Sequence, residues 1–529
     1  MTKKIKHGKN DGSERELSKK AKITVNEEDD NICQKCNRHT HKDDPEARQT
    51  RKNGGTTLMS KKKSHFRLLE DFDLIGCDNC AQWYHKVCSG LEQFQYNLFD
   101  KYYCPKCVPT VGNSVEFPQS APHRKTWWSP EERKSPMQVG SKQWIQYFTS
   151  WESKVPPPSA SELTVAQNGF EFKKVFEKAG GFEKWDRVYL IREKKGLDMK
   201  MPDFATFDLE NVVEMMGGAY LVDTIDVYSQ TTCSMKLDTF LEKFRNTEDR
   251  SLIYNFLSLE FSKNRRLCEV VQAPKFVQDV SLVDLVFGGD SNDPKVADEH
   301  RPRVEQFCLA SMAGSYTDFH VDFGGSSVYY HIFSGQKIFY ILPPSNENLE
   351  AFAAHETGGS ASTWFGNKTN GRCRRVLVNR GETLLIPSGW IHAVLTPADS
   401  LVFGGNFLHL GNCAMQFRIF DLEARIQQTT QIDEKFYFPN FKLVHWLLMS
   451  KILIPAIVEA NGYEEDIRER SAHLWKSAKL TASYLKAWAA ETQNNHDGIG
   501  AAKKREILAK YDEQHAVQTR IQKQKNRKS

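Results

Sequence analysis

Hydrophobic and polar positions change their pattern along the chain and predict regions of different architecture. Between about residues 201 and 410, short apolar or alternating runs such as SSVYYHIF, KIFYILPP and SLVFGGNFL are separated by Gly, Pro and Asn. Many short strands with turn residues between them are typical of a barrel or a double-sheet sandwich. FEFKKVFEKAG, before Gly181, has a helical pattern, and FKLVHWLLMSKIL and SAHLWKSAKLTASYLKAWAAE beyond residue 440 predict amphipathic helices.

Length and composition indicate a soluble protein of several domains. The chain has 529 residues, 40% hydrophobic and 26% charged, and a prior of one domain per roughly 150 residues suggests three or four domains. The longest apolar region, WLLMSKILIPAIVEA, is interrupted by Ser450, Lys451 and Pro455, so we expect no membrane span. The basic N-terminus has no apolar run or cleavage site, which predicts a reducing compartment.

Basic residues gather at both ends of the chain, although the net charge is only +5. KKIKHGK opens the chain and RIQKQKNRKS closes it. Such segments are typical of nuclear import signals or of contacts to nucleic-acid phosphate, and the alternative is a solvated, disordered tail. We expect a nuclear protein whose basic tails, residues 1–30 and 496–529, make non-specific DNA contacts.

Seven of the twelve cysteines lie between residues 33 and 107. Two intervening residues let both thiolates of a pair reach one tetrahedral ion at about 2.3 Å, so eight Cys and His ligands predict two closed structural zinc sites. A disulfide framework is the alternative, and the lack of a secretion signal disfavours it. The candidate ligands, in chain order, are Cys33, Cys36, Cys77, Cys80, His85, Cys88, Cys104 and Cys107.

The stretch YTDFHVDFGG places His320 and Asp322 two residues apart, so that in a strand both side chains would face one space and could chelate a metal. The pattern alone is weak, because chance supplies roughly one His-x-Asp per chain of this size. A third ligand is suggested by His392 in PSGWIHAVLTP. Two histidines and one carboxylate favour non-haem Fe(II), although zinc can use the same ligands.

An iron oxygenase of this type also needs a site for 2-oxoglutarate. The far carboxylate of that dicarboxylate needs a cation, and Lys337 in SGQKIFYILPP is well placed at the next apolar strand. Thr317, three residues before His320, can add a hydroxyl donor. A lysine at the start of a strand is normally a solvated edge charge, but the apolar run after Lys337 indicates a buried wall.

The order of zinc ligands, with Trp83 two places before His85, resembles the plant homeodomain (PHD) finger. The resemblance implies interleaved sites, one with Cys33, Cys36, His85 and Cys88 and the other with Cys77, Cys80, Cys104 and Cys107. The gap between Cys36 and Cys77 looks like an inserted loop, in which His39 or His41 could replace a ligand. Such fingers read the histone H3 tail with an aromatic cage, and the resemblance implies reading of trimethylated lysine 4 with Trp83 as the cage candidate.

The segment YTDFHVDFGGSSVYYHIFSGQKIFYILPP, with PSGWIHAVLTP and FGGNFLH, resembles the Jumonji C (JmjC) domain of lysine demethylases that carry a PHD finger. The resemblance covers about residues 30 to 490. It implies that His320, Asp322 and His392 bind iron, and that Asn406 lies near the substrate lysine. It implies 2-oxoglutarate contacts by Thr317, Lys337, Tyr330 and Asn255, although Tyr330 and Asn255 could instead be hydrogen-bonding core residues.

The resemblance implies a multidomain fold: a small double-zinc PHD finger, a double-stranded β-helix (jelly-roll or cupin-like) JmjC domain with flanking helices, and a helical C-terminal region. We expect the finger at residues 31–110, linker and helices at 111–200, the JmjC domain at 201–435 and the helical domain at 436–495. The implied reaction removes mono- and dimethyl marks from lysines 9 and 27 of histone H3 in the nucleosome, with Fe(II), 2-oxoglutarate and O2. The alternatives are a protein hydroxylase and a non-catalytic chromatin reader.

Overall fold

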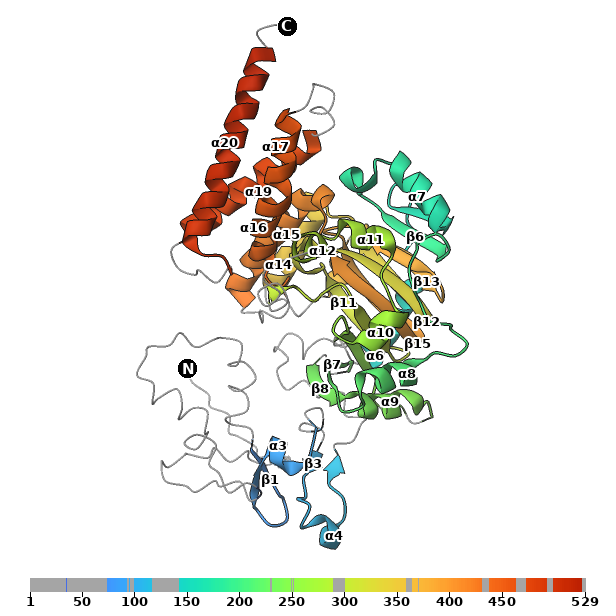
Figure 1. The fold of residues 1–529 in the computed structure, drawn as a ribbon. Helices are drawn as coiled ribbons and strands as arrows, with labels where there is room; N and C mark the ends of the chain where they lie inside the picture. Colours follow the sequence, from blue (N-terminus) through green and yellow to red (C-terminus); the bar gives the residue numbers. More distant parts are fainter. Residues whose placement is uncertain are drawn as a thin grey trace, which may run out of the picture. The chain divides into compact units, whose positions relative to one another are not determined.

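A computed structural model describes residues 35, 74–92, 95, 99–116, 142–228, 231–248, 250, 252–288, 300–357, 364–369, 371–430, 437–462, 472–491 and 498–525. The chain divides into two compact units, Met1–Phe117 and Pro118–Ser529. Each unit has buried residues of its own. A multidomain fold with a cysteine-rich N-terminal unit, a β-sheet domain and C-terminal helices is confirmed (Figure 1).

The described residues of the first unit contain few regular elements. They are two antiparallel strand pairs and two short helices: β1 (Leu74–Gly76) with β2 (Trp83–His85), β3 (Phe99–Lys101) with β4 (Val115–Glu116), α3 (Lys86–Ser89) and α4 (Val108–Val111). Two tyrosines, Tyr84 and Tyr102, and three cysteines, Cys77, Cys104 and Cys107, form its buried centre. A centre this small is typical of domains that depend on a bound metal for stability.

The second unit is built on an 11-stranded sheet in the order β5-β6-β14-β12-β15-β10-β9-β7-β8, with β11 beside β15 and β13 beside β12. Among the strands that the structure describes, only β5 and β6 pair in parallel. The strands are β5 (Leu163–Asn168), β6 (Val188–Glu193), β7 (Leu221–Asp226), β8 (Thr231–Lys236), β9 (Tyr254–Glu260), β10 (Phe307–Ser311), β11 (Tyr316–His320), β12 (Ser327–Leu342), β13 (Arg374–Asn379), β14 (Thr383–Ile386) and β15 (Ile391–Phe407).

Two long antiparallel strands, β12 and β15, form the centre of this sheet. Their pairing runs from Ser327 opposite Phe407 to Leu342 opposite Ile391, and its register shifts between Ile332 and Ile338. The two apolar runs of β12 were expected as separate strands, but the chain continues between them through Gly335. This glycine has φ +81°, and a Cβ there would lie 2.1 Å from the carbonyl oxygen of Asp399, so only glycine fits the bend.

Helices cover the sheet and form a layer of their own at the C-terminal end (Figure 1). The predicted helix before Gly181 is α7, whose N-terminus is capped by the side chain of Asn168. The helices preceding and within the sheet region are α6 (Lys142–Ser150), α7 (Gly169–Lys178), α8 (Leu209–Met216), α9 (Leu237–Arg245), α10 (Arg265–Val270), α11 (Lys275–Val280), α12 (Leu282–Phe287) and α14 (Asn346–Thr357). Those at the C-terminal end are α15 (Cys413–Thr430), α16 (Phe441–Leu448), α17 (Ile454–Gly462), α19 (Ala472–Ala490) and α20 (Ala501–Lys525).

The most apolar helical segment belongs to the C-terminal core. Among the described residues, one helical segment, Phe441–Asn461, has the length and apolar composition that crossing a membrane requires. In this protein 56% of its most apolar window is buried inside the fold. Trp446, Leu448 and Leu453 are fully buried there. A π-helical turn, Met449–Leu453, precedes Pro455, which lacks the N–H of a regular helix.

The segment expected as a basic tail after residue 496 differs from that expectation. Residues Ala501–Lys525 form α20. Ile507 and Tyr511 are 2% and 3% exposed and join the C-terminal core, and even Lys504 is buried beside the ring of Trp446. The first half of α20 is therefore packed, because a few apolar residues among many charges meet the core at helical spacing.

Candidate functional site

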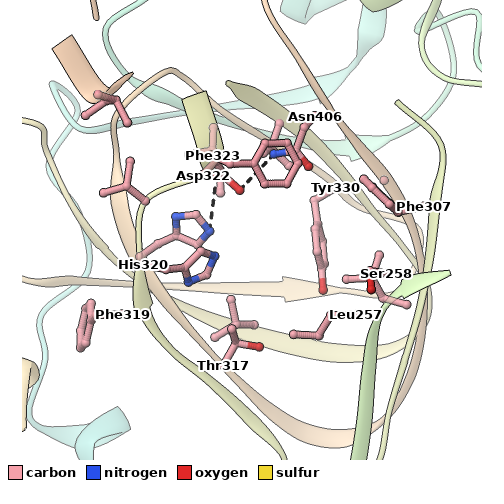
Figure 2. Close-up of a pocket in the computed structure, with 18 of the residues that line it drawn as sticks. Leu257, Ser258, Phe307, Thr317, Phe319, His320, Asp322, Phe323, Tyr330 and Asn406 are labelled. Atoms are coloured by element: carbon pink, nitrogen blue, oxygen red, sulfur yellow. Dashed lines mark hydrogen bonds and ion pairs between the residues drawn. The ribbon is translucent and has the colours of Figure 1, made fainter. Parts of the chain in front are cut away.

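Three of the residues predicted to bind metal meet at one end of β11. His320 ends β11, Asp322 follows in the next turn, and His392 lies opposite His320 in the pairing of β11 with β15. The candidate ligand atoms of the three side chains all lie within 4.8 Å of one another, and His392 Nε2 is 3.8 Å from Asp322 Oδ2. In Figure 2 the side chains of His320 and Asp322 face a common space inside the sheet domain. We call His320, Asp322 and His392 the His/Asp/His cluster.

Backbone carbonyl groups fix the orientation of both imidazoles. His320 Nδ1 lies 2.9 Å from the carbonyl oxygen of Asp318, and His392 Nδ1 lies 3.1 Å from that of Trp390. Because a carbonyl only accepts, each Nδ1 carries a hydrogen, so Nε2 is the ring nitrogen that can bind a metal. Burial lowers the pKa of His392 to about 4, and the neighbouring His320 adds to this effect. The set of two imidazoles and one carboxylate fits Fe(II), and zinc can also use it.

Asn406 orients the carboxylate of the cluster. Its Nδ2 donates to Asp322 Oδ1 over 3.1 Å (Figure 2) and to Ser326 Oγ over 2.9 Å. Asn406 lies near the end of β15. Asn406 also lines the pocket that contains the cluster. Its predicted role beside a substrate lysine stays a prediction, and its contact with Asp322 is a feature that sequence spacing did not reveal.

A pocket of about 650 Å³ contains the cluster and Lys337. The ammonium of Lys337, 2% exposed, donates to Thr396 Oγ1 over 2.7 Å. Burial lowers the pKa of Lys337 to about 7, and within the described part of the chain no carboxylate forms an ion pair with it. A buried ammonium without a counter-charge is costly, so the site fits an anionic group that enters beside the cluster. Thr396, four residues after His392 on the same strand, was not identified from the sequence.

Two other predicted contacts line the pocket and one does not. Thr317 and Tyr330 face the cavity, and the ring of Tyr330 packs edge-on against Phe339. Asn255 is 1% exposed and accepts a 2.6 Å hydrogen bond from Ser311 Oγ, and it is absent from the lining residues, to which β9 contributes Leu257 and Ser258. The alternative of a hydrogen-bonding core residue fits this placement of Asn255.

One wall of the pocket combines apolar side chains with carboxyl groups. Helix α15 presents Ile419, Leu422, Glu423 and Ile426 on one face, and Glu356 of α14 lies on the same lining. Burial, with the nearby charge of Asp318, raises the pKa of Glu356 to about 7. Burial also raises the pKa of Glu423 to about 8, and the charge of Asp322 adds to this effect. Such a wall suits a ligand with an aliphatic stem and a cationic end.

In the first unit, four cysteines form a second candidate metal centre. The sulfurs of Cys77, Cys80, Cys104 and Cys107 all lie within 4.8 Å of one another. The backbone N–H of Cys104 donates to Cys77 Sγ over 3.2 Å, and Asn79 Nδ2 donates to Cys107 Sγ over 3.3 Å. Four thiolates at this separation, with N–H groups directed at sulfur, fit a structural zinc ion.

Of the other predicted zinc site only half lies within the described residues. His85 Nδ1 is 3.8 Å from Cys88 Sγ, so these two ligands are neighbours. Cys33, Cys36 and the alternative ligands His39 and His41 lie outside the described residues. Trp83 is half-buried, opposite Gly76 in the pairing of β1 with β2, and its role in methyl-lysine reading stays a prediction.

Three family models match the chain in the order of its structural parts. They are the PHD-finger, residues 67–107, the JmjC domain, hydroxylase, residues 307–407, and the Jumonji helical domain, residues 411–515. The first match begins after Cys33 and Cys36 and contains the other predicted zinc ligands. The second contains the His/Asp/His cluster and Lys337, and the third includes α15 and part of α20.

Curated proteins similar to this chain are lysine demethylases. Lysine-specific demethylase 7B of Danio rerio is 34% identical over 416 residues, which are 78% of this chain and 68% of that protein. Lysine-specific demethylase 7A of Mus musculus is also 34% identical over 416 residues, here 42% of the relative. Histone lysine demethylase PHF8 of Danio rerio is 34% identical over 417 residues, 38% of the relative. The chain thus spans less than half the length of several of these relatives.

Proposed function

The chain belongs to the family of lysine-specific demethylases with a PHD finger, a JmjC domain and a Jumonji helical domain, and we propose that it is an Fe(II)- and 2-oxoglutarate-dependent histone lysine demethylase. The observation that carries the proposal is the position of the His/Asp/His cluster beside the buried ammonium of Lys337 in one pocket. Bound Fe(II) and 2-oxoglutarate would supply the oxidation by O2 of an N-methyl group, which leaves as formaldehyde while 2-oxoglutarate becomes succinate and carbon dioxide.

The roles of the chain's own residues follow from their contacts. His320, Asp322 and His392 would bind the iron, and Asn406 would keep Asp322 turned toward it through the 3.1 Å hydrogen bond. Lys337 would pair with the far carboxylate of 2-oxoglutarate, and Thr317 and Tyr330 would contact the same cosubstrate. The walls of the pocket would limit access of other oxidisable groups to the reacting centre.

The lining of the pocket supports a cationic substrate. Asp223, Glu356 and Glu423 contribute carboxyl groups to it, and among the described lining residues Lys337 is the one lysine or arginine. A methylated lysine has an aliphatic stem for the apolar wall and a positive end for these carboxyl groups. We propose mono- and dimethylated lysines 9 and 27 of histone H3 as substrates, with the dimethyl form preferred.

The test incubates the full chain with Fe(II), 2-oxoglutarate and H3 peptides carrying one methylation state at lysine 9 or 27. Mass spectrometry should show loss of methyl groups from dimethyl peptides, together with succinate and formaldehyde. His392→Ala should abolish all three products, while His355→Ala, which replaces a half-buried histidine outside the pocket lining, should retain them. If dimethyl peptides stay unchanged and oxygen is added to an unmethylated substrate, the protein is a hydroxylase. If no peptide leads to succinate formation, the protein is a non-catalytic reader.

For the PHD finger we propose two structural zinc ions and binding of the H3 tail trimethylated at lysine 4. The four-cysteine centre and the neighbouring pair His85 and Cys88 support the two metal sites. Binding of one mark by the finger would raise the effective concentration of a second lysine at the catalytic pocket. Peptide titrations should show tighter binding of the trimethylated than of the unmodified peptide, and Trp83→Ala should remove that difference. Equal affinities in the unsubstituted chain would contradict the reading role.

A nuclear location and contact with nucleosomal DNA are part of the same proposal. Exposed basic residues on α20, including Arg505, Arg520 and Lys523, and the basic N-terminal sequence support it. Affinity for free duplex DNA should fall steeply as salt increases, because each phosphate contact releases counterions. Affinity that does not change with salt would contradict phosphate contacts.

A further inference from the structure

The turn after Asp322 packs closely against α15. Residues Phe323–Gly325 form a short 3-10 turn in which Gly324 and Gly325 both have φ +60°. A Cβ on Gly325 would lie 2.9 Å from the Cα of Gln416 on α15. The glycine pair therefore allows both the left-handed backbone and the close approach of the turn to the helix.

Glu423 of α15 makes a direct hydrogen bond to this turn. Its Oε1 accepts the backbone N–H of Gly324 over 2.8 Å, across 99 positions of sequence. Gly324 is two residues after Asp322, so the bond fixes the chain just past the metal-binding carboxylate. The neighbouring residues are fixed from other elements, since Ser388 Oγ donates to the carbonyl of Gly325 and Asn406 donates to Ser326.

The contact of Glu423 is with the backbone and not with a cation. In the described part of the chain no lysine or arginine forms an ion pair with Glu423. Its neighbours on the same helix face, Ile419, Leu422 and Ile426, are apolar and line the pocket. A carboxylate in this position has one described hydrogen-bond donor, and that donor is Gly324.

We propose that Glu423 is a positioning residue for the metal site: its hydrogen bond to Gly324 keeps the turn in the conformation that directs Asp322 toward His320 and His392. The inference rests on the proposed iron site. It makes α15, which belongs to the match with the Jumonji helical domain, a contributor to metal affinity in the JmjC domain. Outer contacts that orient metal ligands typically change affinity by about 10–100-fold when removed.

The test compares variants that keep or remove the acceptor. Glu423→Met retains length and helix propensity but removes the carboxylate, whereas Glu423→Gln retains an oxygen that can accept from Gly324. Arg425→Gln is the control, because it removes a surface ion pair to Glu350 from the same helix. Mn(II) is the probe, since hard Mn(II) does not suit the thiolate sites of the zinc-loaded finger, and free Mn(II) is measured by electron paramagnetic resonance on the full chain.

We expect Glu423→Met to weaken Mn(II) binding by about 10-fold, with Glu423→Gln and Arg425→Gln close to the unsubstituted chain. Unchanged affinity in Glu423→Met, or equal losses in the Met and Gln variants, would overturn the positioning role. If Glu423→Met does not fold, Glu423→Ala takes its place. Weaker Mn(II) binding in Glu423→Ala than in Glu423→Gln would support the positioning role, and equal binding in the two variants would overturn it. Failure of the proposed iron site would give a different result from failure of the positioning role. In that case His320→Ala would bind Mn(II) with the same affinity as the unsubstituted chain.

Discussion

Lys337 donates a 2.7 Å hydrogen bond from Nζ to Thr396 Oγ1 inside a pocket where its ammonium is 2% exposed. The hydroxyl of Thr396 is neutral, so it cannot balance the charge of the ammonium. The ligand that completes this pair should therefore be an anion.

Replacing Lys337 by Met should remove that anion site. We expect the KM for 2-oxoglutarate to rise by about 10- to 100-fold, the equivalent of the 1.5–3 kcal/mol typical of a hydrogen bond to a charged group. Thr396→Val retains the charge and should give a smaller increase. Succinate formation at varied 2-oxoglutarate measures both. An unchanged KM in Lys337→Met would place the cosubstrate elsewhere.

The affinity for 2-oxoglutarate should depend on pH. Burial lowers the pKa of Lys337 from 10.5 to about 7 in the free protein, and an anionic ligand favours the protonated amine. Above pH 7, binding should take up a proton, so KM should increase with pH. Calorimetry at pH 8 in two buffers of different ionisation enthalpy should detect the uptake, and Lys337→Met should abolish it.

The lowered pKa of Lys337 also makes the free energy of unfolding depend on pH in a defined direction. Between about pH 7 and 10.5 the unfolded chain holds a proton on this lysine that the free folded protein lacks. The contribution of Lys337 to the free energy of unfolding should therefore decrease as the pH falls from 10.5 to 7, and stay constant below 7. Bound 2-oxoglutarate should reduce this dependence in thermal unfolding. A pH profile identical in Lys337→Met would contradict the assignment.

Asn406→Ala should weaken metal binding through Asp322. Loss of the 3.1 Å hydrogen bond frees the carboxylate to turn away from His392, and we expect Mn(II) affinity to fall by about 10-fold. Gln336→Ala, which removes an exposed amide contact with Asn379, is the control. Equal affinities in the two variants would show that Asn406 does not orient Asp322.

Cys104→Ser should release zinc from the finger without affecting the catalytic unit. The two units have separate cores, so iron binding and succinate formation should persist while zinc content falls. Cys233→Ser, a partly buried cysteine of the second unit whose sulfur donates to a backbone carbonyl, should retain all its zinc. Loss of catalysis in proportion to zinc in Cys104→Ser would show that the units depend on one another.

Much of the candidate site could be predicted because most of its residues lie on strands whose apolar runs are visible in the sequence. His320, His392 and Lys337 occur in or beside such runs, where a polar residue is conspicuous. Glu423 could not be identified in this way, because one acidic residue on an amphipathic helix looks like any other, and its contact with Gly324 depends on tertiary packing. Asn255 was predicted to contact 2-oxoglutarate, but it forms a hydrogen bond with Ser311 in the core. The run YNFLSLEF alone does not show which of the two directions its side chain takes.

The glycines of the second unit illustrate a further limit. Gly405, in the FGGNF segment, would place a Cβ 2.0 Å from the carbonyl oxygen of Glu305, so the constraint comes from a segment 100 residues earlier in the chain. The sequence shows a flexible dipeptide at this point, and only the folded sheet explains why no larger residue fits. Similarly, the charges of α20 concealed the few side chains that join the core.

The geometry of strand β15 limits the insertions and deletions that the gene could accept during evolution. His392 near its start and Asn406 near its end both reach the pocket, and side chains alternate along the regular stretches of the strand on either side of its register shifts against β12. A one-codon insertion between these positions would reverse the facing of one residue relative to the other and separate Asp322 from its hydrogen-bond donor. Natural indels should therefore be absent from residues 392–406, and a scan of single-codon insertions should show a gap in tolerance over this interval.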